Sequence, residues 1–228
     1  MSKDGKGVRP VLDWFGMLWD FKWDYLSGAK ITVLLSLFSV LAGFILGVVI
    51  VLVRMSGFKP LKWLTTAYIE LVRGTPLLVQ IFIIYFGLTE FGIEFSPFMA
   101  GVVAVSINSS AYLSEIFRAG IQAIDRGQAE AARSLGMSKA MTLRHIVLPQ
   151  AFRNVLPAIG NEFVTIIKET SIVSFIGITD IMFQTEVIRS KTYTALGPLM
   201  GAAMMYFILT FTLSKAVATL ERKLSSHD

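Results

Sequence analysis

Five long apolar stretches, separated by polar or charged segments, dominate the chain. We place helices at about residues 29–53, 61–88, 97–124, 154–176 and 195–221. Each stretch is long enough to cross a bilayer, which takes roughly 20 mainly apolar residues in a helix. The pattern therefore predicts an all-α integral membrane protein with five transmembrane helices, in a single transmembrane domain over residues 29–224.

Composition supports the membrane class. Hydrophobic residues make up 54% of the 228 residues, too many for an ordinary soluble domain. The formal net charge of +5 does not indicate nucleic-acid binding, because the basic residues cluster between the hydrophobic stretches. The sequence contains no cysteine, so it has neither disulfides nor thiol chemistry.

Basic residues predict the orientation. Arg54, Lys59 and Lys62 follow the first stretch, and residues 118–153 contain six further arginines and lysines. Because cytoplasmic loops are enriched in lysine and arginine, both regions are expected inside the cell. The loop at residues 177–195 is then external. Five spans place the N-terminus outside and the C-terminus in the cytoplasm.

Residues 1–28 mix aromatic and charged side chains and lack the continuous apolar core of a cleavable signal peptide. Helical spacing links Leu12, Phe15, Leu18, Trp19 and Lys22. This spacing favours a short amphipathic helix in the membrane interface. A disordered tail followed by an aromatic belt explains the segment equally well.

The second stretch is interrupted by the sequence Arg73-Gly74-Thr75-Pro76. Thr75 can cap a new helix that has Pro76 in its first position. Broken backbone at membrane depth persists only where it is buried in protein or lines a wet cavity. We therefore expect a functional break here rather than a simple kink.

Polar side chains inside the predicted spans are candidates for function, because a charge at a helix centre costs roughly 2.5–3.5 kcal/mol to insert. Glu162 and Glu169 lie about two helical turns apart and share one face, and Asn108 and Glu115 repeat that spacing. The acidic pair can accept hydrogen bonds from a cationic group of a transported molecule. The Thr75 hydroxyl and the Asn108 amide can donate to an anionic group.

Internal neutralisation is the alternative for the charged members of this set. The side chains concerned are Arg73, Glu115, Glu162, Lys168 and Glu169. Glu115 lies one helical turn from Arg118 and can pair with it near the inner interface.

The chain lacks the residues for catalysis. It has no G-x-x-x-x-G-K-[ST] phosphate loop and only two histidines, His145 and His227, so neither an ATP site nor a zinc cluster is expected. No nucleophile–base constellation is evident. We expect a non-catalytic subunit without a metal or cofactor, and any catalysis must come from a partner.

The longest polar segment between the apolar stretches is GQAEAARSLGMSKAMTLRHIVLP, residues 127–149. Its pattern predicts two short helices joined by a glycine corner. Gly136 supplies the left-handed residue that ends the first helix. Ser138 can cap a second helix over Ala140 to Val147, and Pro149 is expected to end that helix.

The order E-A-A-x3-G-x9-I-x-L-P in this segment resembles the EAA loop of the membrane-spanning subunits of bacterial ABC importers. In that family the loop is cytoplasmic, and its short helix docks in a groove on the ATPase. The resemblance implies a type I importer transmembrane domain whose coupling loop covers residues 125–153. The coupling residues it implies are Glu130, Ala131, Ala132, Gly136, Met137, Ser138, Ile146, Leu148 and Pro149.

Further segments resemble the polar amino acid branch of these permeases, close to its glutamine, arginine and histidine types. They are RGTPLLVQ from Arg73, INSSAYLSEIFRAGI from Ile107 and GNEFVTIIKETS from Gly160, and the similarity extends from Ser27 to Leu224. The resemblance implies substrate contacts at Glu162, Glu169, Asn108 and Thr75. Related permeases often have aspartate at the position of Glu169, which leaves the pocket depth open.

The resemblance also implies partners. They are two ATPase subunits, a second permease protomer that is identical or paralogous, and an extracellular or periplasmic amino acid binding protein. The expected cargo is glutamine, glutamate or a cationic amino acid, with cystine and opines as other options. The acidic pair favours a cationic or neutral amino acid. An ion-coupled secondary transporter would also place carboxylates in broken helices, but it leaves the cytoplasmic EAA order unexplained.

Overall fold

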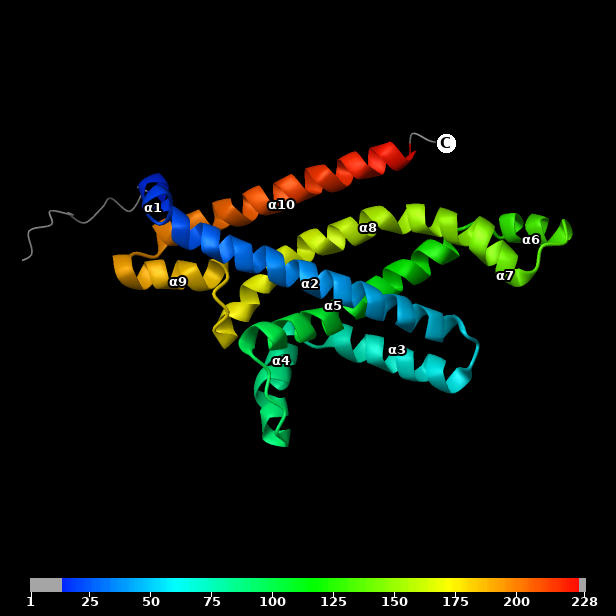
Figure 1. Ribbon diagram of the computed structural model, residues 1–228, viewed down its shortest axis with the longest axis horizontal. Coiled ribbons are helices and arrows are strands. Elements are labelled where there is room, and N and C mark those ends of the chain that lie inside the picture. Colours follow the sequence, from blue (N-terminus) through cyan, green and yellow to red (C-terminus); the bar gives the residue numbers. More distant parts are fainter. Residues whose placement is uncertain (1–13, 226–228) are drawn as a thin grey trace, which may run out of the picture.

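The computed structural model describes residues 14–225, and over that range the protein contains only helices joined by turns and short loops (Figure 1). The first half comprises α1 (Trp14–Asp20), α2 (Lys22–Met55), α3 (Lys59–Gly74), α4 (Leu77–Phe82), the π-helical turn η1 (Ile83–Gly87), the 3-10 turn η2 (Leu88–Phe91) and α5 (Pro97–Gln122). The second half comprises α6 (Arg126–Ser134), α7 (Lys139–Thr142), the π-helical turn η3 (Leu143–Val147), α8 (Leu148–Glu169), the 3-10 turn η4 (Thr170–Ile176), α9 (Ile181–Thr192) and α10 (Leu196–Ser225). The predicted all-α class is confirmed.

The long helices α2, α3, α5, α8 and α10 run along one direction of the molecule (Figure 1). Helices α6 and α7 lie at one end, α1 and α9 lie toward the other, and the α4 segment projects sideways. Three helices, Lys22–Met55, Pro97–Gln122 and Leu196–Lys223, are long and apolar enough to cross a membrane. Two further pairs are bent, so the described residues contain three to five candidate spans.

The first bent pair is the predicted break in the second span. The segments Lys59–Gly74 and Leu77–Phe91 meet at 107°. The details of the corner differ from the prediction, because Thr75 does not cap the new helix. Its backbone is extended, as expected before proline, and Pro76 is extended as well, so α4 begins only at Leu77. The Thr75 hydroxyl instead donates back to the Leu71 carbonyl oxygen at 2.9 Å.

The second bent pair joins Lys139–Ile176 to Ile181–Thr192 at 54°. The prediction that Pro149 ends a loop helix is wrong, since η3 runs directly into α8 at Leu148. The proline ring is tolerated because Pro149 occupies the first turn of α8, after a π-helical turn that shifts the hydrogen-bond register.

The expected external loop contains the helix α9 rather than irregular chain. Asp180 caps it, because its Oδ1 accepts a hydrogen bond from the Phe183 N–H at 2.8 Å. Ile181, Thr185 and Ile188 recur at helical spacing on one side and are fully buried. Charged residues lie between these buried positions, so the segment is not a continuous apolar stretch and hydropathy alone does not identify it as a helix.

The predicted N-terminal amphipathic helix can be compared with the structure only in part, because Leu12 and the other residues before Trp14 lie outside the described residues. Phe15 and Lys22 belong to two successive helices, since α1 ends at Asp20 and α2 already begins at Lys22 rather than near residue 29. Trp19 is exposed, with the Lys22 ammonium 3.8 Å from its ring centroid. A position in the membrane interface stays a prediction.

Small residues bring α2 against α5, the two helices at the centre of the bundle. A Cβ atom added to Gly43 would lie 3.0 Å from the Ser109 Cβ, and one added to Gly47 would lie 3.1 Å from the Leu113 Cβ. Any larger side chain at either glycine would push the helices apart. The largest hydrophobic cluster then joins these helices to α4 and α8; it includes Leu35, Ile81, Ala104, Val105 and Ile166.

Candidate functional site

The acidic pair of α8 lies at the edge of the packed face of that helix. Glu162 and Glu169 are both half-buried, and Ile166 between them is buried in the central hydrophobic cluster. Neither carboxylate makes a hydrogen bond or an ion pair with any residue in the described part of the chain. Internal neutralisation within one protomer therefore does not account for these two acids.

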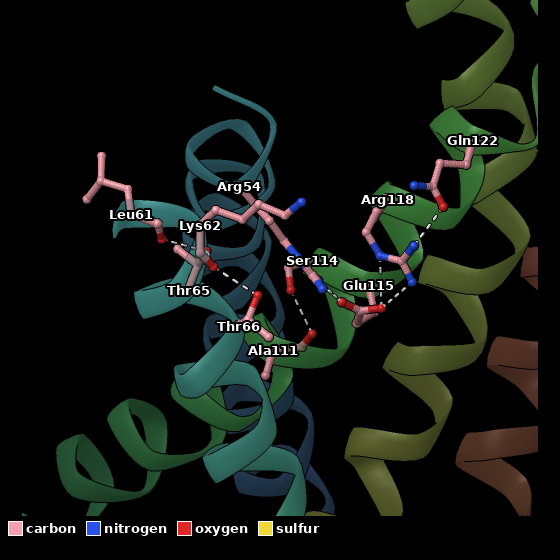
Figure 2. Close-up of polar contacts among 10 residues, drawn as sticks. All are labelled: Arg54, Leu61, Lys62, Thr65, Thr66, Ala111, Ser114, Glu115, Arg118 and Gln122. Atoms are coloured by element: carbon pink, nitrogen blue, oxygen red, sulfur yellow. Dashed lines mark hydrogen bonds and ion pairs between the residues drawn. The ribbon is translucent and has the colours of Figure 1, made fainter. Parts of the chain in front are cut away.

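Glu115 behaves differently, because two arginines neutralise it (Figure 2). Its Oε2 accepts hydrogen bonds from Arg118 Nη2 at 2.6 Å and Nε at 3.1 Å, and its Oε1 pairs with Arg54 Nη1. Arg118 also donates to Gln122 Oε1 at 2.6 Å. The predicted pairing with Arg118 is confirmed, and Arg54 adds a link from α2 to α5. Within one protomer, Glu115 therefore ties α2 to α5 through its two ion pairs.

The helix break contains a polar bridge centred on Gln80, whose side chain is 9% exposed. Its amide nitrogen lies 2.7 Å from the Val72 carbonyl oxygen and 2.9 Å from Thr75 Oγ1. Its Oε1 accepts a hydrogen bond from Asn108 Nδ2 of α5 at 3.1 Å. The predicted site residues Thr75 and Asn108 are thus brought together, but through Gln80 rather than directly.

Sequence reasoning did not give Gln80 or Arg54 a role. The available signal for Gln80 was an amide in an apolar stretch one helical turn after Pro76. Arg54 was counted only as a marker of the cytoplasmic turn, and its long-range partner cannot be identified without the fold.

Arg73 ends α3 at the break and carries an exposed side chain. Its guanidinium carbon lies 5.2 Å from the ring centroid of Tyr112 on α5. Within residues 14–225 the Arg73 side chain forms no hydrogen bond or ion pair, and the same holds for the Lys168 side chain. A cation over a ring is worth roughly 0.5–2 kcal/mol, less than the roughly 2.5–3.5 kcal/mol needed to insert a charge.

The two groups of candidate site residues lie on elements that pack together. Helix α4 contacts η4, which directly follows Glu169, and α5 contacts α8. No hydrogen bond in the described chain connects Glu162 or Glu169 to Thr75 or Asn108. The arrangement places two acids without hydrogen bonds on one helix, and hydrogen-bonded amide and hydroxyl groups at a neighbouring helix break.

The loop at the end of the bundle has the predicted glycine corner. Gly136 has a φ of 86°, and the backbone N–H of Met137 donates to the Ala132 carbonyl oxygen at 3.2 Å. Ser138 caps the second helix, as predicted, because its Oγ accepts a hydrogen bond from the Met141 N–H at 3.2 Å. The corner thus has a defined shape set by its backbone.

Apolar side chains project from this loop. Leu135 is 86% exposed and Met141 is 50% exposed, whereas Ala132 is buried. Most of the implied coupling residues are accessible: Glu130, Ala131, Gly136, Ser138, Leu148 and Pro149 are exposed, and Met137 and Ile146 are half-buried. Among residues 14–225 there is no group of histidine and acidic side chains that could hold a metal ion.

Comparison with known proteins adds independent findings. Residues 20–226 match the family described as binding-protein-dependent transport system inner membrane component. The arginine transport system permease protein ArtQ of Bacillus subtilis (strain 168) is 44% identical over 204 residues, which cover 89% of this chain and 93% of that protein. The probable glutamine ABC transporter permease protein GlnM of the same organism is 40% identical over 200 residues, covering 88% and 93%. A solved amino acid ABC transporter, crystallised with histidines, superposes with a TM-score of 0.89 at 47% identity, covering 93% of this chain and 99% of that one.

Proposed function

We propose that Glu162 and Glu169 contact the substrate as it crosses the membrane. The chain belongs to the family of binding-protein-dependent transport system inner membrane components. The protein is the transmembrane subunit of an amino acid ABC importer. Charged side chains within membrane helices are candidates for contact with the cargo, because they are costly to insert. The observation that carries the proposal is the pair of half-buried carboxylates without a partner in the described chain. A substrate ammonium or guanidinium group would supply the missing positive charge.

The acidic pair favours a cationic or neutral amino acid, since an anionic side chain would be repelled. Similar permeases are named for arginine and for glutamine, which agrees with that preference. Asn108 and Thr75 complete the site from the helix break. Both side chains are hydrogen-bonded to Gln80. The substrate must therefore either displace the Gln80 amide or bind to the arrangement of side chains that these hydrogen bonds maintain.

The chain acts together with partner proteins, and ATP hydrolysis takes place on those partners. We infer a second permease protomer, two ATPase subunits that bind ATP and Mg²⁺, and an extracellular binding protein that delivers the amino acid. The loop from α6 to η3 faces the cytoplasm and presents Leu135 and Met141 to a groove on the ATPase. With this end inside, an odd number of spans places the N-terminus outside.

Transport then follows from a change in population between two conformations. ATP binding closes the ATPases, the loop moves with them, and the helices turn from inward-facing to outward-facing. The amino acid is released from the binding protein toward Glu162, and hydrolysis restores the inward state. The coupling requires that nucleotide-bound ATPase has different affinities for the two conformations.

Direct binding tests the acidic pair. The permease–ATPase complex is purified without binding protein, and the dissociation constants of radiolabelled L-arginine and L-glutamine are measured for wild type, Glu162→Gln and Glu169→Gln. We expect arginine to bind about 10- to 100-fold more weakly to each variant, with a smaller change for glutamine. Glu186→Gln is the matched control, because Glu186 is exposed and pairs with Arg189 one turn away on α9. Unchanged arginine affinity in both variants would remove the acidic pair from the site.

A further inference from the structure

Arg73 is a cation inside the transmembrane region with no acidic partner in the described chain. It ends α3 at the helix break, and its guanidinium carbon lies 5.2 Å from the centroid of the Tyr112 ring. The guanidinium forms no hydrogen bond within residues 14–225, so its N–H groups are available to a ligand. The side chain is exposed on a single protomer.

The length of α3 places this group away from the cytoplasmic surface. The helix begins at Lys59, just after the basic turn, and extends to Gly74. At 1.5 Å per residue, Arg73 lies roughly 21 Å along the helix axis from Lys59, against a hydrocarbon core of about 30 Å. A guanidinium at that depth, beside a broken backbone, is stable where it faces a water-filled pathway and not where it faces lipid.

We propose that Arg73, held by Tyr112, binds the α-carboxylate of the transported amino acid. This inference rests on the proposed function and adds the recognition of a group that every α-amino acid carries. The planar guanidinium can donate two parallel N–H bonds to a carboxylate. Asn108 lies one turn before Tyr112 on α5, so these two side chains share one face of that helix.

The assignment divides recognition between two charges. The carboxylate binds at Arg73, and the cationic groups of the substrate bind at Glu162 and Glu169. Helix α4, which follows Arg73 after the break, packs against η4, which follows Glu169, so the segments that adjoin the two ends of the site contact each other. Arg73 therefore recognises the α-carboxylate of the amino acid and not its side chain. A matching amine without a carboxylate should bind poorly.

The test compares amino acids with their amides, in which a neutral carboxamide replaces the α-carboxylate. The purified permease–ATPase complex, in lipid nanodiscs without binding protein, is titrated with L-arginine, L-argininamide, L-glutamine and L-glutaminamide. Wild type should bind each amino acid about 10- to 100-fold more tightly than its amide. Arg73→Gln should abolish that preference by weakening the acid alone, and Arg73→Lys should retain part of it.

Lys59→Gln is the matched control, because it removes one positive charge from the other end of the same helix. It should leave both the affinity and the preference unchanged. Equal binding of acid and amide by wild type would overturn the inference without relying on any variant. A preference that survives in Arg73→Gln, with arginine binding still weakened by Glu162→Gln, would overturn the inference alone. A wild-type complex that binds no amino acid would overturn the proposed function and this inference together.

Discussion

Replacing Gly136 by valine should uncouple ATP hydrolysis from transport. Gly136 has a φ of 86° at the corner between α6 and α7, and a Cβ atom added there would meet no other atom within 4 Å. The substitution therefore introduces backbone strain without a steric clash. For an L-residue this left-handed geometry costs roughly 1–2 kcal/mol, which lowers the equilibrium constant for forming the corner about 5- to 30-fold.

Gly92→Val is the matched control for this experiment. Gly92 has a φ of 76° in the turn after η2, again with nothing within 4 Å of an added Cβ, so the same strain is placed far from the loop. The complex is reconstituted in liposomes, and the amino acid transported per ATP hydrolysed is measured.

We expect this ratio to fall by about the same 5- to 30-fold in Gly136→Val and to remain normal in Gly92→Val. Normal uptake in Gly136→Val would refute the role of the corner. An equal loss in both variants would show that general destabilisation, and not the loop, causes the effect.

Three further substitutions test the polar and packing features. Gln80→Leu leaves its buried partners unpaired, so it should destabilise the complex by about 1–3 kcal/mol in thermal unfolding and weaken amino acid binding. Gln184→Leu should do neither, since the Gln184 side chain forms no hydrogen bond within the described residues. Glu115→Gln removes the charge that pairs with two arginines, so it should lower thermal stability by about 1–3 kcal/mol. It should not change the ratio of arginine affinity to glutamine affinity, and a changed ratio would make Glu115 a pathway residue. Gly120→Val places a Cβ against the Val155 side chain and should lower the free energy of unfolding by about 1–3 kcal/mol. Adding Val155→Ala should restore part of that stability, and no restoration in the double variant would contradict this packing.

The all-helical class and the break in the second span were predictable because each rests on local signals. Apolar length identifies the helices, and the Gly-Thr-Pro sequence identifies the corner. The glycine corner of the loop was predictable for the same reason, since Gly136 and the cap Ser138 act on their own neighbours. These features depend on residues close together in the chain.

Long-range partners were not predictable from one sequence. The tie from Arg54 to Glu115 and the bridge from Gln80 to Asn108 join residues that are far apart in the chain. The effect of Pro149 depends on its place in the helix, because a proline ends a helix from within but is tolerated in the first turn. The helix α9 was missed because its charges break the apolar run that hydropathy requires.

Uptake by the reconstituted complex tests the central claim most directly. The chain, its ATPase and its binding protein are placed in liposomes, and uptake of L-arginine and L-glutamine is followed with ATP inside or with imposed proton and sodium gradients. We predict uptake that requires both internal ATP and the binding protein, and that persists when ionophores remove the gradients. Uptake that follows an ion gradient in liposomes without the ATPase would contradict the account.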